Sequence, residues 1–215
     1  MPAAKCLVIR GGALGDFILT LPVLSALRRQ FPAIHLALLG YSKYAELALA
    51  GGLVDELRSI DARPLAGFFA RNGPLDSNLC AYFSEFALVI SYLYDPDQIF
   101  EDNFAKCSKA QFIAGPHRPH EAERVHATSV FLKPLERLAI FDADPAPRLR
   151  LSSAQLPPGL EATGSWINHS PTVALHPGSG SETKNWPMQH WQIFLSLLAQ
   201  QTSVQVLLIL GEAEE

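Results

Sequence analysis

The feature that most constrains the fold is a strand–turn–helix pattern at the start of the chain. Residues 6–10 form a short apolar run, and residues 11–16 form a glycine-rich turn. Residues 17–31 then place apolar side chains at nearly helical spacing. A glycine-rich turn between a buried strand and a helix indicates a Rossmann-like unit. No third glycine follows at the spacing of a dinucleotide fingerprint, so the pattern argues against a nicotinamide cofactor.

Asp16 lies where this turn becomes the helix, and two interpretations are open. As a helix N-cap, an aspartate stabilises the helix by about 1 kcal/mol and needs no further function. As a functional group, it is a carboxylate at the carboxyl end of a parallel strand, where open α/β sheets bind their ligands. Pro22 is too deep for a first-turn proline, so we expect a kink or a regular helix that starts near Thr20.

Strands and helices alternate along the rest of the first 141 residues. We expect strands at 35–39, 56–60, 86–91 and 110–114, and helices at 43–50 and 121–141. This alternation predicts an α/β fold with a parallel sheet and helices on both faces. Residues 142–171 are polar and proline-rich, which is typical of a linker. The expected organisation is a first domain at 1–141, a linker at 142–171 and a second domain at 172–215.

A second strand–turn–helix pattern carries most of the functional information. The apolar residues 172–175 precede HPGSGSETKNWPMQHW, residues 176–191, which lead into an apolar-periodic stretch. Backbone N–H groups and the positive end of a helix dipole converge at such a turn and favour a phosphate. Lys184 adds a cation, and Ser179, Ser181 and Thr183 add hydroxyl donors. The turn lacks the order of a Walker loop, and an ordinary polar loop remains the alternative.

The two motifs together resemble glycosyltransferase family 9, the ADP-heptose:lipopolysaccharide heptosyltransferases and their relatives. IRGGALGDFILTLPVLSALRRQFP, residues 9–32, carries the first match, and ALHPGSGSETKNWPMQHW, residues 174–191, carries the second. The resemblance implies a GT-B-like architecture, in which two Rossmann-like domains face each other across a cleft. The first would hold the acceptor and the second the nucleotide-sugar donor. Relatives continue past the position of Glu215, so we expect the second Rossmann-like domain to be represented only by its first part.

The resemblance also implies roles for individual residues. Asp16 corresponds to the catalytic base of an inverting transfer, and Lys184 to the lysine that binds the donor diphosphate. The phosphate-contacting turn would comprise Ser179, Gly180, Ser181 and Thr183. Glu212 and Glu214 both lie where relatives place a glutamate on the donor ribose, and the choice between them is open. On the acceptor side we expect Gly12, Ala13, Gly15 and Arg118.

Composition excludes several classes of protein. The chain is 48% hydrophobic and 18% charged, which is typical of a globular protein. A net charge of −4 argues against nucleic acid as a partner. No apolar run is long enough to span a bilayer, and the start, MPAAK, lacks the pattern of a signal peptide. Three widely spaced cysteines suggest reduced thiols in the cytoplasm.

The histidines of GPHRPHEAERVH, His117, His120 and His126, fit no standard zinc spacing. We therefore expect no metal and no cofactor, and interpret the segment as a solvated loop. A further alternative is that Lys106, Lys109, His117 and Arg118 bind an acidic acceptor.

The sequence thus predicts a transferase that uses an ADP-heptose-like donor and a glycan or glycolipid acceptor. It would be cytoplasmic, with peripheral contact at the inner membrane surface. Two rivals remain: a truncated, non-catalytic GT-B half that binds a glycan or a partner, and another nucleotide-sugar enzyme such as an epimerase.

Overall fold

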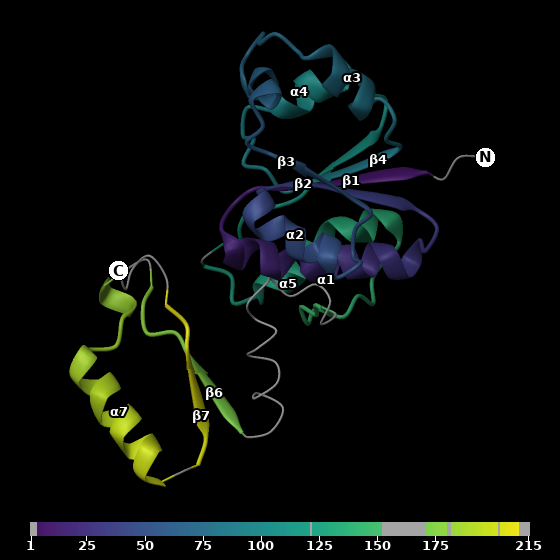
Figure 1. Ribbon diagram of the computed structural model, residues 1–215. Helices are drawn as coiled ribbons and strands as arrows, with labels where there is room; N and C mark the ends of the chain where they lie inside the picture. Colours follow the sequence, from purple (N-terminus) through teal and green to yellow (C-terminus); the bar gives the residue numbers. More distant parts are fainter. Residues whose placement is uncertain (1–3, 121, 152–170, 180–181, 202, 211–215) are drawn as a thin grey trace. The chain divides into compact units, whose positions relative to one another are not determined.

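The computed structural model describes residues 4–120, 122–151, 171–179, 182–201 and 203–210. The chain divides into two compact units, residues 1–152 and 153–215, and each has its own parallel sheet. The expected α/β class and parallel pairing are therefore confirmed (Figure 1). The exact bounds of the two domains and the linker stay predictions.

A five-stranded parallel sheet forms the centre of the first unit. Its strands are β1 (Lys5–Arg10), β2 (His35–Gly40), β3 (Glu56–Ser59), β4 (Leu88–Ser91) and β5 (Gln111–Ala114). Their spatial order is β3-β2-β1-β4-β5. The chain runs outward from β1 to β3 and then crosses back to β4, so the strand order reverses between β1 and β4. Open α/β sheets bind their ligands outside the carboxyl ends of the strands at this switch point.

Helices cover both faces of this sheet. On one face lie α1 (Leu14–Gln30), α2 (Ser42–Ala50) and α5 (Ala127–Leu132) (Figure 1). On the other lie the 3₁₀ helix η1 (Arg63–Phe69), α3 (Ser77–Phe83) and α4 (Ile99–Ala105). Alternate residues of β1 serve different cores, because successive side chains of a strand point to opposite faces. Cys6 and Val8 join the first core, and Leu7 and Ile9 join the second.

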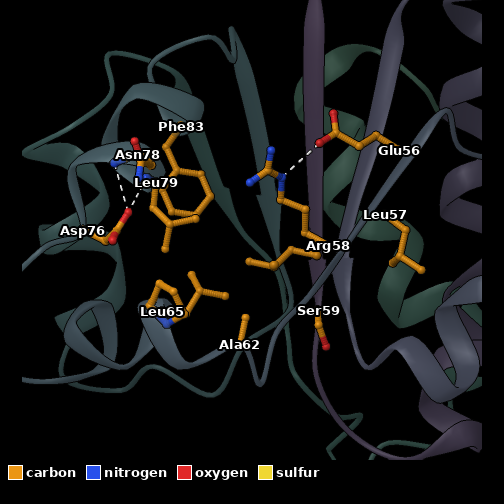
Figure 2. Close-up of a pocket in the computed structure, with 12 residues that line it drawn as sticks. Glu56, Leu57, Arg58, Ser59, Ala62, Leu65, Asp76, Asn78, Leu79 and Phe83 are labelled. Atoms are coloured by element: carbon orange, nitrogen blue, oxygen red, sulfur yellow. Dashed lines mark hydrogen bonds and ion pairs between the residues drawn. The ribbon is translucent and has the colours of Figure 1, made fainter.

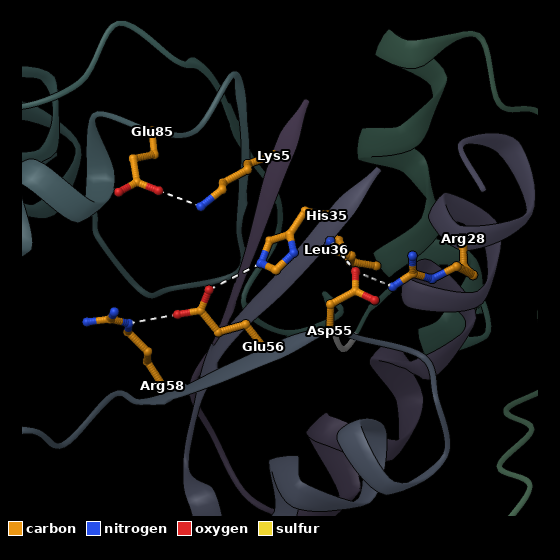
Figure 3. A network of polar contacts seen from close by, with 8 residues as sticks. All are labelled: Lys5, Arg28, His35, Leu36, Asp55, Glu56, Arg58 and Glu85. Atoms are coloured by element: carbon orange, nitrogen blue, oxygen red, sulfur yellow. Dashed lines mark hydrogen bonds and ion pairs between the residues drawn. The ribbon is translucent and has the colours of Figure 1, made fainter. Parts of the chain in front are cut away.

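The amino ends of β2 and β3 are held by a polar network (Figure 3). The Asp55 carboxylate accepts hydrogen bonds from Arg28 Nη2 at 2.7 Å and from the Leu36 N–H at 2.8 Å. Glu56 lies 3.2 Å from His35 Nε2. Because β3 is an edge strand, its backbone pairs with β2 alone. The side-chain contacts of Asp55 and Glu56 add to this pairing.

The alternative of a helix start near Thr20 is wrong, and so is the single helix expected at 121–141. The first helix begins at Leu14 and runs through Pro22 to Gln30, so its start is not displaced to Thr20. The single helix expected at 121–141 is replaced by α5 and the 3₁₀ helix η2 (Lys133–Leu138). His126 Nδ1 accepts a hydrogen bond from the Thr128 N–H and caps α5. Pro134 lacks an N–H group, which interrupts α-helical hydrogen bonding at that point.

The expectation of three reduced thiols is also wrong in the structure. Cys80 of α3 and Cys107, just after α4, form a disulfide, with their Cα atoms 4.8 Å apart. Cys6 is free and buried in β1. The disulfide therefore joins the two α-helices on one face of the sheet.

The second unit comprises β6 (Thr172–Leu175), the 3₁₀ helix η4 (Glu182–Lys184), α7 (Met188–Gln201) and β7 (Gln205–Leu208). The strands β6 and β7 pair in parallel. The strand–turn–helix order matches what the second motif predicts, and β7 follows it. No helix among the described residues has both the length and the apolarity to cross a membrane.

Candidate active site

Asp16 lies at the carboxyl edge of the five-stranded sheet, in the first turn of α1. The N-cap of this helix is Ala13, so Asp16 is the third helical residue and not the cap itself. Its Oδ2 accepts a hydrogen bond from the Ala13 N–H at 3.1 Å. Its side chain is 39% exposed. The Asp16 carboxylate therefore binds the N–H of the N-cap residue from the first turn of the helix, and part of it remains exposed to solvent.

Gly12 allows the turn to approach this carboxylate. Its φ angle is +93°, a conformation that side-chain-bearing residues rarely adopt. A Cβ atom on Gly12 would lie 2.6 Å from Asp16 Oδ2. Gly15, in contrast, has no atom within 4 Å of such a position and lies inside α1. The steric requirement for glycine thus falls on Gly12 and not on Gly15.

Arg10, the last residue of β1, is a site residue that the sequence analysis missed. Its Nη2 lies 3.4 Å from Asp16 Oδ1, although only 2% of the Arg10 side chain is exposed. Burial lowers the pKa of Arg10, whereas the neighbouring charge of Asp16 acts to raise it. The sequence offered no signal for this residue, because the burial of Arg10 is not visible in it.

The segments that follow β4 and β5 come together beside Arg10. Its Nη1 donates to the backbone carbonyl of His117 at 2.9 Å. The His117 ring packs on Tyr94 with ring centroids 4.6 Å apart. Partial burial lowers the pKa of His117, and the positive charges of Arg118 and Arg10 lower it further.

A cavity of 510 Å³ adjoins this segment and is lined by His117, Arg118, Pro119, His120 and Ala122. Arg118 thus lines a cavity next to His117, whose backbone carbonyl binds Arg10. Its expected role in acceptor binding stays a prediction. Lys106 is not part of this group: its Nζ donates to Asn103 Oδ1 at 2.8 Å, and it lines a different cavity with Arg71. The four basic residues considered for an acidic acceptor thus do not form one cluster.

A second cavity, of 290 Å³, has Gly12 in its lining. Its remaining lining residues are Tyr41, Ser42, Lys43, Tyr44, Ser59 and Asp61. These residues lie at or just after the carboxyl ends of β2 and β3. Aromatic rings beside hydroxyl and charged groups suit a sugar, because rings pack on C–H faces and polar groups bind hydroxyls. The sequence analysis missed this group, since nothing local links residues 41–44 to residues 59–61.

A third cavity, of 560 Å³, lies between β3 and the elements α3 and η1 (Figure 2). Leu65, Leu79 and Phe83 give it an apolar wall. Arg58 lies at its edge and covers the Tyr82 ring at 3.6 Å from the centroid. Ser59 lines both this cavity and the one at Gly12, so the two adjoin.

The described residues of the second motif lie in a turn between β6 and α7. Lys184 ends η4 and is exposed, Thr183 belongs to the same 3₁₀ helix, and Ser179 precedes it. Pro187 directly precedes α7, and its carbonyl accepts the His190 N–H at 2.9 Å. Gly180, Ser181, Glu212 and Glu214 lie outside the described residues. The proposed phosphate and ribose contacts therefore stay predictions.

No cluster of three or more His, Cys, Asp or Glu side chains suited to a metal occurs in the described parts of the chain. His126, one of the three histidines considered for a metal, instead caps α5.

The parallel sheet of the first unit and the strand–turn–helix order of the second are also found in solved glycosyltransferases of GT-B-like fold. Several solved structures are similar to this chain. The chain matches a glycosyltransferase of family 9 from Veillonella parvula with a TM-score of 0.64 and 16% identity, over 99% of this chain and 71% of that one. The sequence matches no protein-family model and no curated protein.

Two E. coli enzymes are similar in the same way. Heptosyltransferase WaaC with ADP matches with a TM-score of 0.58 and 16% identity, over 96% of this chain and 67% of that one. ADP-heptose lps heptosyltransferase II matches with a TM-score of 0.63 and 14% identity, over 95% of this chain and 63% of that one. At these identities the likeness establishes the fold, and the resemblance to family 9 is confirmed at that level.

Proposed function

We propose that this protein is an inverting glycosyltransferase that moves a heptose or a related sugar from an ADP-sugar to a lipopolysaccharide-core or similar glycan. The observation that carries the proposal is the half-exposed Asp16 carboxylate at the switch point of a heptosyltransferase-like fold. Structures of WaaC contain ADP and an ADP-2-deoxy-2-fluoro heptose. These ligands motivate the choice of donor.

The reaction requires a general base and stabilisation of the leaving group. The acceptor hydroxyl loses its proton as it attacks, and Asp16 would take that proton as general base. The departing diphosphate gains negative charge, which Lys184 and the backbone N–H groups of its turn would stabilise. The cavities beside Gly12 and Arg118 would hold the acceptor, with aromatic and hydroxyl groups in one and cationic groups in the other. Attack opposite the leaving group inverts the anomeric centre.

Substitution of Asp16 tests the role of the base. Asp16→Asn keeps the shape and an oxygen that accepts the Ala13 N–H, but an amide takes up no proton. We expect kcat to fall by about 100-fold or more, with the Kd for ADP unchanged. The assay is release of ADP from ADP-heptose in the presence of deacylated lipopolysaccharide core. Full activity of Asp16→Asn contradicts the assignment of the base.

Substitution of Lys184 tests the donor site separately. Lys184→Ala should weaken ADP binding by roughly 10- to 100-fold, the worth of a hydrogen bond to a charged group. Lys133→Ala, another exposed lysine, serves as the matched control in calorimetric titrations with ADP. Unchanged affinity of the Lys184 variant counts against the donor site. Binding of ADP by the unmodified chain without transfer to any glycan favours a non-catalytic binding role.

The proposal extends to a cytoplasmic location with peripheral contact at the membrane face, where a glycolipid acceptor would present its sugars. Fractionation of cells that express the protein tests this directly. Recovery of the protein only outside the cytoplasmic and membrane-associated fractions contradicts it.

A further inference from the structure

Arg10 is a buried cation beside Asp16, and the proposed mechanism gives it no role. The Arg10 residue is 3% exposed, and β1 places it at the carboxyl edge of the sheet. Charged side chains are rarely buried unless they are paired and hydrogen-bonded. The groups that hold this guanidinium therefore indicate what it does.

Three backbone carbonyls from three segments accept hydrogen bonds from Arg10. Nη1 donates to His117 at 2.9 Å and to Tyr92 at 3.4 Å, and Nε donates to the Asp16 carbonyl at 3.3 Å. The Phe131 ring lies 4.5 Å from the guanidinium carbon, within the range of a cation–π contact. The Tyr92 ring lies 5.8 Å away. The guanidinium is thus fixed by backbone groups beyond β1, β4 and β5 and by two aromatic rings.

The remaining nitrogen, Nη2, faces the Asp16 carboxylate. It lies 3.4 Å from Oδ1 and has no hydrogen-bond partner among the described residues. Oδ2 of the same carboxylate is held by the Ala13 N–H. One oxygen is thus fixed by the backbone of the turn, and the other is oriented by a rigid positive charge. The exposed side of the carboxylate stays open to an incoming hydroxyl.

We infer that Arg10 is the positioning residue for Asp16, and that it fixes the carboxylate in the orientation required to accept the proton of the acceptor hydroxyl. This inference rests on the proposed function. Arg10 takes no part in the proton transfer and touches neither substrate. A planar guanidinium meets several acceptors in fixed directions, which a lysine ammonium does not.

Kinetics of Arg10→Met and Arg10→Lys test the inference. Arg10→Met should lower kcat by about 10- to 100-fold through misplacement of the base, with the KM values for ADP-heptose and the deacylated core within threefold of the original. Arg10→Lys should give an intermediate kcat. Arg28→Met is the matched control, because Arg28 also binds a carboxylate, Asp55 at 2.7 Å, and a backbone carbonyl, Ile34 at 3.0 Å, away from Asp16. It should lose stability and keep its kcat.

A double-variant cycle separates positioning from general damage to the fold. If Arg10 acts through Asp16, Arg10→Met causes no further loss of kcat in an Asp16→Asn background. Equal fold-losses in both backgrounds, or an Arg10→Met variant with full kcat, overturn the inference while the base assignment stands. Full activity of Asp16→Asn instead overturns the proposed base, and the positioning role with it.

Urea unfolding of the same variants tests the contact between Arg10 and Asp16 without an activity assay. The summed losses in unfolding free energy of the two single variants should differ from the loss of the double variant, because contacting residues are coupled. Additive losses show that the two side chains do not interact, and overturn the inference. Absence of transfer by the unmodified chain contradicts the proposed function and the catalytic part of the inference together.

Discussion

The backbone conformation of Gly12 allows the turn to approach the Asp16 carboxylate closely. Gly12→Ala should cost about 1 kcal/mol of stability because of its positive φ. It should also displace Asp16 and lower kcat by about 100-fold, because the new Cβ would approach Oδ2 to 2.6 Å. Thermal unfolding and the ADP-release assay check both effects.

Gly52→Ala is the control for this variant. Gly52 has a φ of +66° and no atom within 4 Å of an added Cβ, so it carries the backbone cost without the clash. Equal kcat losses in the two variants would show that Gly12 matters for folding rather than for the placement of Asp16.

At the residue scale, the sequence predicted what depends on neighbours in the chain. Asp16 was singled out because a helix start after a glycine-rich turn is a local pattern, and Gly12 came from the resemblance to family 9. Arg10 was missed because an arginine at the end of an apolar run usually reaches solvent. Its burial depends on carbonyls 82 and 107 residues further along the chain. No local pattern contains that information.

At the scale of single elements, the Asp55 carboxylate, directly before β3, should make the first unit sensitive to acid. Partial burial acts to raise the pKa of Asp55, but the hydrogen bonds from Arg28 and the Leu36 N–H outweigh it, and the net pKa lies below the ordinary value. A lowered pKa in the folded state adds stability above the unfolded value of about 4, and that stability is lost as pH falls through the folded value.

We therefore expect Asp55→Asn to lower the urea midpoint at pH 6 and to flatten its decline between pH 6 and pH 3. Glu46→Gln, an exposed carboxylate of α2, should leave both unchanged. A decline in the Asp55 variant as steep as in the original protein would assign the acid sensitivity to other groups.

The disulfide between α3 and the end of α4 offers a second prediction for the elements. It closes a loop with a sequence separation of 27. Replacing both Cys80 and Cys107 by alanine should reduce the unfolding free energy by roughly 3 kcal/mol. Dithiothreitol should have the same effect on the original chain and none on the variant.

In a reducing compartment, Cys80 and Cys107 would occur as thiols. Two titratable thiols besides Cys6 in freshly lysed cells would therefore agree with the cytoplasmic proposal.

The elements themselves were predicted well where periodicity was strong. The strand pattern and the start of α2 were found within one or two residues. The helix expected at 121–141 failed because its apolar positions fitted a helix only loosely and Pro134 lies within it. The disulfide was missed because two distant cysteines give no local signal for a pairing that depends on how α3 and α4 pack.

At the scale of the whole molecule, the buried apolar cores belong to the first unit. Both clusters draw their buried members from residues between Cys6 and Ile140. Among the described residues of the second unit, Leu175 is buried, whereas Ile193, Leu197 and Leu208 are exposed. Residues 1–152 alone should therefore unfold cooperatively, with a urea midpoint close to that of the full chain. A much lower midpoint for the fragment would show that the second unit stabilises the first.

The overall architecture followed from the alternation of strands and helices, since short crossovers through helices lead to parallel pairing. The alternation did not specify which strands are neighbours. The order β3-β2-β1-β4-β5, which puts Asp16 at the switch point, became visible only in the structure.

The contrast in exposure between Arg10 and Asp16 has a consequence for turnover. The guanidinium is sealed from water, but the carboxylate beside it is 39% exposed. On the proposed mechanism, a proton collected by Asp16 in each cycle passes straight to bulk water. The enzyme would then need no relay of further titratable side chains to regenerate its base, and replacing H₂O by D₂O should slow bond formation rather than a later proton-release step.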